Sequence, residues 1–135
     1  MLLISRAVWL EMVAHALDGL PDEACGLLGG DLATGRVELF YPCRNAAASS
    51  RVYTIDPRDH LRADRDAADR GLDITGVVHS HTHTEAYPSP TDVAQAPDPS
   101  WHYVIVSLGR DEPVLRSYRI ADGEVAEEEV LAGDR

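Results

Sequence analysis

Residues 73–92 read DITGVVHSHTHTEAYPSPTD, and this stretch decides how the chain folds. The short apolar run from 73 to 79 is bounded by a turn signal, which predicts a buried strand that ends at the histidines. Side chains two residues apart on a strand lie on one face, with Cα atoms about 7 Å apart. His79 and His81 can therefore point at one metal ion.

The residues after this strand supply a third ligand. Ser89 suits a helix N-cap, Pro90 the first helical position and Asp92 the third, so we expect a short helix at about 90–96 whose start brings Asp92 back to the strand end. Two histidines and one carboxylate leave zinc an open position for a water whose pKa falls to about 7. Ser-x-x-Asp is also an ordinary helix start, and His-x-His occurs in proteins that bind no metal. The two motifs together, at this spacing, favour a metal site.

These residues, with Ala86 and Pro88, resemble the signature of the JAMM (MPN+) family of zinc metallopeptidases. Residues 21–30, PDEACGLLGG, resemble the segment in which that family places a glutamate upstream, and Glu23 is the matching position. The resemblance covers nearly the whole chain. It is nearest to small bacterial members that act on ubiquitin-like sulfur-carrier proteins.

The resemblance implies a role for each residue. His79, His81 and Asp92 would hold one Zn²⁺ per chain. Glu23 would be the general base that takes a proton from the attacking water, and Ser89 would donate a hydrogen bond to the developing oxyanion. Without the downstream motif, the favoured interpretation of Glu23 is a solvated acid next to Asp22 in a helix-to-strand turn, and Asp22 competes for its role. The match selects Glu23 and leaves Asp22 exposed.

Periodicity and stop signals predict a mixture of helices and strands. We expect helices at Arg6–Asp18 and from Pro57, capped by Asp56, to just before Gly71. Expected strands are 24–28, 36–41, 51–55, 73–79, 102–108, 114–120 and 125–130. The order implies an α/β fold, a three-layer α-β-α sandwich with a mixed, curved sheet, similar to the family's deaminase-like fold. Residues 1–135 suit a single domain.

Composition narrows the partners. Twelve basic and 23 acidic residues give a net charge of −11, which argues against nucleic acid and anionic membranes as partners. Glu127–Glu129 is interpreted as a solvated edge or tail. No run approaches the roughly 20 apolar residues of a membrane span, so we expect a cytoplasmic protein. Cys25 and Cys43 are expected to be reduced thiols, Cys25 buried.

The function implied by the resemblance is a zinc-dependent (iso)peptidase. It would hydrolyse the amide bond after the C-terminal Gly-Gly of a ubiquitin-like sulfur-carrier protein, releasing cysteine or another attached amino acid, with the carrier tail added as a strand beside the motif. A deconjugating isopeptidase for ubiquitin-like modifiers is one alternative. A non-catalytic MPN scaffold, or a cupin-like site formed by His79, His81 and Glu85, is another. The remaining histidines, His15, His60, His83 and His102, are expected to be structural or, for His83, exposed.

Overall fold

Eight strands and three helices make up the regular structure of residues 1–133, the part of the chain that this computed structural model describes. The strands are β1 Leu2–Ser5, β2 Cys25–Asp31, β3 Arg36–Cys43, β4 Asp73–His81, β5 His102–Ser107, β6 Val114–Ala121, β7 Glu124–Glu128 and β8 Val130–Gly133. The helices are α1 Arg6–Asp18, α2 Pro57–Asp69 and α3 Pro90–Ala94.

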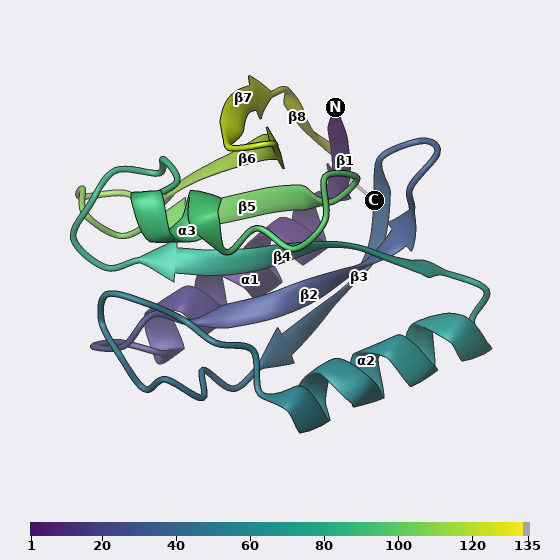
Figure 1. Ribbon diagram of the computed structural model, residues 1–135, viewed down its shortest axis with the longest axis horizontal. Helices are drawn as coiled ribbons and strands as arrows, with labels where there is room; N and C mark the ends of the chain where they lie inside the picture. Colours follow the sequence, from purple (N-terminus) through teal and green to yellow (C-terminus); the bar gives the residue numbers. More distant parts are fainter. Residues whose placement is uncertain (134–135) are drawn as a thin grey trace.

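All eight strands join one sheet in the order β7-β6-β5-β4-β2-β3-β1-β8. β1 runs parallel to β3 and β8, and β4 runs parallel to β5, whereas the other neighbours are antiparallel. β7 and β8 lie at opposite ends of this order, yet only Glu129 separates them in the chain. The sheet must therefore curl until its edges approach each other, as the top of Figure 1 shows. The predicted mixed, curved sheet is confirmed.

Helices cover both faces of the sheet (Figure 1). α1 packs on one face in a core cluster that includes Met12, Val78 and Val104, and α2 packs on the other with Val77 and Ile105. Successive residues of β4 thus face opposite helices, and burial on both faces explains why its sequence is an almost continuous apolar run. Each such buried side chain stabilises the fold by about 1.5–3 kcal/mol. The three-layer prediction is confirmed.

Local sequence signals account for the ends of the long helices. Ser5 caps α1 by accepting a hydrogen bond from the Val8 N–H, and α1 has the predicted bounds. Asp56 caps α2 by accepting from Arg58 N–H, with Pro57 as the first residue. Gly71 follows α2 with a φ of 72°, a conformation that favours glycine. These signals act within a few residues, so the sequence reveals them.

Several predicted strand boundaries were wrong. Residues 51–55 form no strand; an isolated bridge joins Asn45 to Ile55, and side-chain hydrogen bonds replace a ladder there. β1 was missed because its four residues lead directly into α1. The strand predicted at 125–130 is divided at Glu129 into β7 and β8, which lie at opposite edges of the sheet. β4 extends two residues further, to His81, and α3 ends earlier, at Ala94.

The acidic run near the C-terminus is not wholly solvated. The side chain of Glu128 is 6% exposed and bonds to His102 and Ser117. Its neighbour Glu127 is half exposed, as predicted. Cys25 and Cys43 are both free thiols, and Cys25 is buried, as expected; Cys43 is buried as well. None of the helices within residues 1–133 has the length and hydropathy to cross a bilayer.

Candidate metal centre

β4 carries the two histidines to the face of the sheet that α2 covers. β2 pairs with one edge of β4, where Cys25 lies opposite His79, and β5 pairs with the other, where Ser107 lies opposite His81. His79 and His81 are 3% and 4% exposed. Because hydrogen bonds hold both edges of the strand, the positions of the two ligands are fixed by the sheet.

α3 brings the carboxylate. Ser89 Oγ accepts a hydrogen bond from the Asp92 N–H (3.0 Å), and Asp92 Oδ2 accepts one from the Ser89 N–H (2.8 Å), which makes a reciprocal capping box. The loop before α3 is anchored by buried Ala86, whose carbonyl accepts from the Tyr118 hydroxyl. The predicted helix start is confirmed, and it aims the Asp92 side chain at the strand.

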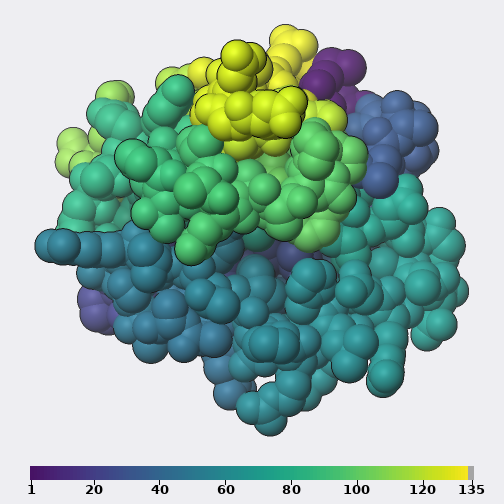
Figure 2. All heavy atoms as spheres, in the orientation of Figure 1, coloured from purple at the N-terminus to yellow at the C-terminus, as the bar shows by residue number. Residues whose placement is uncertain are grey.

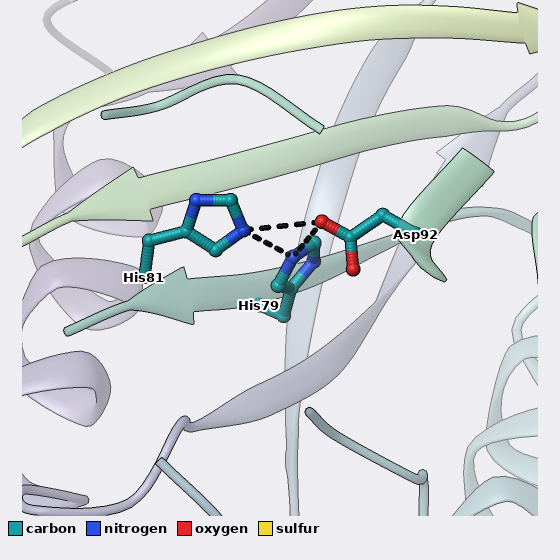
Figure 3. Close-up of side chains that lie close together, drawn as sticks. All are labelled: His79, His81 and Asp92. Carbon is teal, nitrogen blue, oxygen red and sulfur yellow. Dashed lines mark hydrogen bonds and ion pairs between the residues drawn. The ribbon is translucent and has the colours of Figure 1, made fainter. Parts of the chain in front are cut away.

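The three side chains converge on one point (Figure 3). His79 Nε2 and His81 Nε2 are 3.2 Å apart, and each lies 3.1 Å from Asp92 Oδ2. Three donors of a tetrahedral zinc site with bonds of 2.0–2.1 Å lie about 3.3–3.4 Å apart. The triangle is therefore close to the size that a zinc ion requires, and its open side leaves a fourth position.

Hydrogen bonding supports a cation at this point. His81 Nδ1 donates to the Glu85 carbonyl at 2.7 Å, so in the neutral ring Nε2 carries a lone pair. That lone pair faces the carboxylate oxygen of Asp92. Two acceptors at this distance repel unless a proton or a metal cation lies between them, and the donor set suits zinc. The residues present fit the metal that the sequence predicts.

Burial and the carboxylate shape the charges of the ligands. Burial lowers the pKa of His79 below its usual range. Burial also acts to lower the pKa of His81, but its bonds to Asp92 and to the Glu85 carbonyl, with the charges of Asp92 and Glu23, together outweigh burial and the pKa is raised. Burial opposes ionisation of Asp92, yet its bonds to both imidazoles hold its pKa well below the usual range. Asp92 is therefore an anionic ligand at neutral pH.

Glu23 lies just before β2 and is 5% exposed. Burial raises the pKa of its carboxyl to about 7, with His81 lowering it and Asp92 raising it, which places Glu23 within electrostatic reach of both ligands. Its Oε1 is buried and has no hydrogen-bond partner within residues 1–133. Asp22 is more exposed than Glu23. A buried carboxyl with a pKa near neutrality and a free oxygen has the properties of a general base.

Ser80, between the two histidines, holds the Glu23 segment against β4. Its side chain accepts from the Ala24 N–H at 2.8 Å, and its N–H donates to the Ala24 carbonyl at 2.9 Å. Figure 2 shows that this face is hollowed between the green atoms around α3 and the blue to teal atoms of residues 44–56 and α2. No role was predicted for Ser80, which lies between the two ligands on the opposite face of β4.

Three expectations need comment. His83 is exposed, as predicted. The cupin-like ligand set was wrong, because the Glu85 side chain is 69% exposed and pairs with Arg110. β2 and β5 occupy both edges of β4, so a carrier tail added beside the motif has no free edge of that strand to pair with.

Comparisons with known proteins agree with this geometry. Residues 5–121 match the family described as prokaryotic homologs of the JAB domain. The chain is 48% identical over 121 residues to the CysO-cysteine peptidase of Mycobacterium tuberculosis, covering 88% of this chain and 82% of that protein. It is 35% identical over 102 residues to the desampylase of Haloferax volcanii, covering 72% and 73%.

The fold has a solved counterpart as well. A protein of Desulfitobacterium hafniense, whose structure was determined in solution, superposes with a TM-score of 0.91 at 39% identity, covering 100% of this chain and 94% of that one. The matched residues span α1 to β6 and include every residue of the candidate site. The chain belongs to the prokaryotic JAB-domain family, and it is a hydrolase of the JAMM type.

Proposed function

We propose that this protein is a zinc-dependent peptidase that hydrolyses the amide bond after the C-terminal Gly-Gly of a ubiquitin-like sulfur-carrier protein. The hydrolysis releases cysteine or another attached amino acid. The observation that carries the proposal is the triangle of His79, His81 and Asp92 beside a buried, unpartnered Glu23 carboxyl oxygen. A cytoplasmic location and one zinc ion per chain belong to the same proposal.

The chain's own groups would carry the proton through the reaction. A zinc ion held by His79, His81 and Asp92 would lower the pKa of a water molecule and polarise the scissile carbonyl. Glu23 accepts a proton as the water attacks, because its pKa of about 7 lets it take and release a proton near neutral pH. It then returns the proton to the leaving amine. One carboxylate thus serves as base and as acid.

Ser89 supports the developing oxyanion. Its Oγ already accepts from the Asp92 N–H, but the hydroxyl hydrogen has no acceptor within residues 1–133. That hydrogen is free to bond an oxygen on which negative charge grows. A donor of this kind is typically worth about 10²- to 10³-fold in rate.

The relatives guide the choice of substrate. Similarity to the CysO-cysteine peptidase supports a substrate in which an amino acid is attached through its α-amino group to the end of a carrier tail. The desampylase supports the alternative of deconjugating a ubiquitin-like modifier from a protein. All twelve basic residues of this chain are arginine, so no lysine of the enzyme itself can become linked to the modifier when deconjugation is assayed.

Mass spectrometry of a carrier–cysteine adduct, incubated with the zinc-loaded protein, tests the proposal. We expect the adduct to lose its cysteine, whereas chelator-treated protein or a Glu23→Ala variant leaves it intact. Asp22→Ala is the matched control, since it removes the neighbouring carboxylate and should retain cleavage. A carrier joined to a lysine ε-amino group is assayed in parallel.

The outcomes separate the parts of the proposal. Cleavage of the ε-linked adduct alone would favour the deconjugating alternative. Cleavage of neither adduct would remove the carrier as substrate. Full cleavage by Glu23→Ala in the presence of zinc would overturn the assignment of the general base.

A further inference from the structure

The loop of residues 45–55 is folded around the side chain of Asn45. Asn45 Oδ1 accepts hydrogen bonds from the N–H groups of Ala47 (3.0 Å) and Thr54 (2.9 Å), and its Nδ2 donates to the Val52 carbonyl at 3.1 Å. One half-buried amide thus replaces the ladder that a pair of strands would form. The loop has a defined shape that depends on this one side chain.

The same amide connects the loop to the candidate general base. Asn45 Nδ2 also donates to the Glu23 carbonyl at 2.9 Å, and the Glu23 N–H donates to the Ser49 carbonyl at 2.8 Å. Both backbone polar groups of Glu23 are therefore bound by the loop, while the sheet begins only two residues later at Cys25. The loop, together with Ser80, determines where the Glu23 carboxyl lies.

The loop also reaches the metal ligands. The ring of Tyr53 stacks on the imidazole of His79, with centroids 4.3 Å apart and planes 19° apart. The Thr82 hydroxyl, one residue after His81, donates to the Ser50 carbonyl at 3.2 Å. No protein group within residues 1–133 bonds the Tyr53 hydroxyl. The contact with His79 is therefore made by the ring face.

We propose that the loop 45–55 is a positioning element of the active site, in which Asn45 holds Glu23 and Tyr53 fixes the plane of the His79 ring. A ring that is already in its binding orientation loses less freedom when it takes up the metal. When hydrogen bonds hold the backbone of a general base, its carboxyl stays within the hydrogen-bond distance that proton transfer requires. This inference rests on the proposed function, because it assumes that these residues hold zinc and move a proton.

Zinc affinity tests the role of Tyr53 without any substrate. Tyr53→Leu and Tyr53→Met remove the stacked ring, and each should weaken zinc binding about 10-fold or more and alter the visible absorption of the cobalt(II)-substituted protein. Tyr53→Phe keeps the ring and should restore both. Tyr87→Leu is the matched control, since Tyr87 is exposed on the loop before α3 and should leave both readouts unchanged.

Kinetics test the role of Asn45. Asn45→Asp keeps the acceptor for Ala47 and Thr54 but loses the amide donor to Glu23, so kcat should fall about 10- to 100-fold with KM and zinc affinity nearly unchanged. Circular dichroism checks that each variant is folded. Arg51→Ala, on an exposed residue of the same loop, should match the wild type.

The results distinguish this inference from the proposed function. If the wild type binds no zinc, or if His79→Ala binds it equally well, the metal site itself is wrong. If the wild type binds zinc through His79 and every folded Tyr53 variant binds equally well, the stacking role is wrong. A folded Asn45→Asp variant with unchanged kcat would overturn the role of Asn45.

Discussion

Single residues in the motif strand serve both faces of the sheet. His79 and His81 point to the metal centre, whereas Ser80 between them turns to the α1 face and bonds Ala24 through both its side chain and its backbone. Glu23 is the residue before Ala24. Because side chains alternate along a strand, the first and third of these three residues supply metal ligands, and the middle one holds the segment that carries the base.

Ser80→Ala should therefore affect stability and catalysis together. The substitution leaves the buried Ala24 N–H without its side-chain acceptor, which costs about 1–3 kcal/mol in the free energy of unfolding. It also loosens the segment beside Glu23, so kcat should fall while zinc affinity stays the same. Urea unfolding and zinc titration measure the two effects. Wild-type kcat in a destabilised Ser80→Ala protein would show that the bond is structural only.

At the scale of elements, signals within a few residues were predictable and signals from distant contacts were not. The Asp56 cap and the proline at the start of α2, and Ser89 and Asp92 at the start of α3, lie within one helical turn, and all were found where predicted. The prediction of a strand at 51–55 was wrong, because the Asn45 side chain bonds backbone groups of this segment, the Val52 carbonyl and the Thr54 N–H, in place of a neighbouring strand. β1 pairs with residues more than 30 positions away, which no local pattern reveals.

The candidate site likewise combines residues that local sequence reveals with residues that only distant contacts bring to it. Both histidines, Asp92 and Ser89 were identified from spacing in one segment of sequence, and Glu23 from the family resemblance alone. No role was predicted for the residues that hold them. Tyr53 meets His79 from 26 positions away, and Asn45 meets Glu23 from 22 positions away, so only the folded chain shows these contacts.

α3 provides a test at the scale of an element, because Ser89 has two separable functions. Ser89→Ala removes both the cap and the hydroxyl donor, and we expect a loss of about 0.5–2 kcal/mol in the free energy of unfolding and of about 10²- to 10³-fold in kcat. Ser89→Thr keeps both groups and should recover most of each. Ser89→Gly restores most of the capping energy but has no hydroxyl, so its kcat should stay low. Recovery of kcat by glycine would mean that the hydroxyl has no part in catalysis.

At the scale of the whole molecule, closure of the curled sheet depends on a buried polar cluster. His102 opens β5, Ser117 lies in β6 and Glu128 ends β7, one residue before the chain crosses to the opposite edge as β8. Glu128 Oε2 accepts from His102 Nδ1 and from the Ser117 hydroxyl, both at 2.6 Å. The cluster ties three neighbouring strands together. Glu128 Oε1 also accepts from the N-terminal ammonium of Met1, just before β1, at 2.8 Å, where the two edges of the sheet meet.

The charge of Glu128 makes this closure sensitive to acid. Burial opposes ionisation of Glu128, but the bonds from His102, the N-terminal ammonium of Met1 and Ser117 together outweigh it and lower its pKa from the usual 4.5 to about 2. A carboxyl with a lowered pKa in the folded state stabilises the fold above pH 4.5, and that contribution is lost as the pH falls from 4.5 to 2. The shift corresponds to on the order of 3 kcal/mol. Glu128→Gln should therefore lose about this much stability at pH 7 and show a weaker dependence on pH between 4.5 and 2.

Glu127→Gln is the matched control for this prediction. Glu127 is the adjacent glutamate, half exposed, and its ion pair with Arg116 lies on the surface, where such pairs contribute only about 0–1 kcal/mol. Urea unfolding of the wild type and both variants from pH 7 to pH 2.5 separates the two sites. If the two variants lose equal stability at pH 7 and share one acid profile, the buried cluster does not hold the sheet closed, and closure must rest on the apolar contacts of β1 and β8 with α1. If only Glu128→Gln is affected, one carboxylate at the end of β7 links the two edges of the sheet, and the acidic run near the C-terminus is a structural part of the fold.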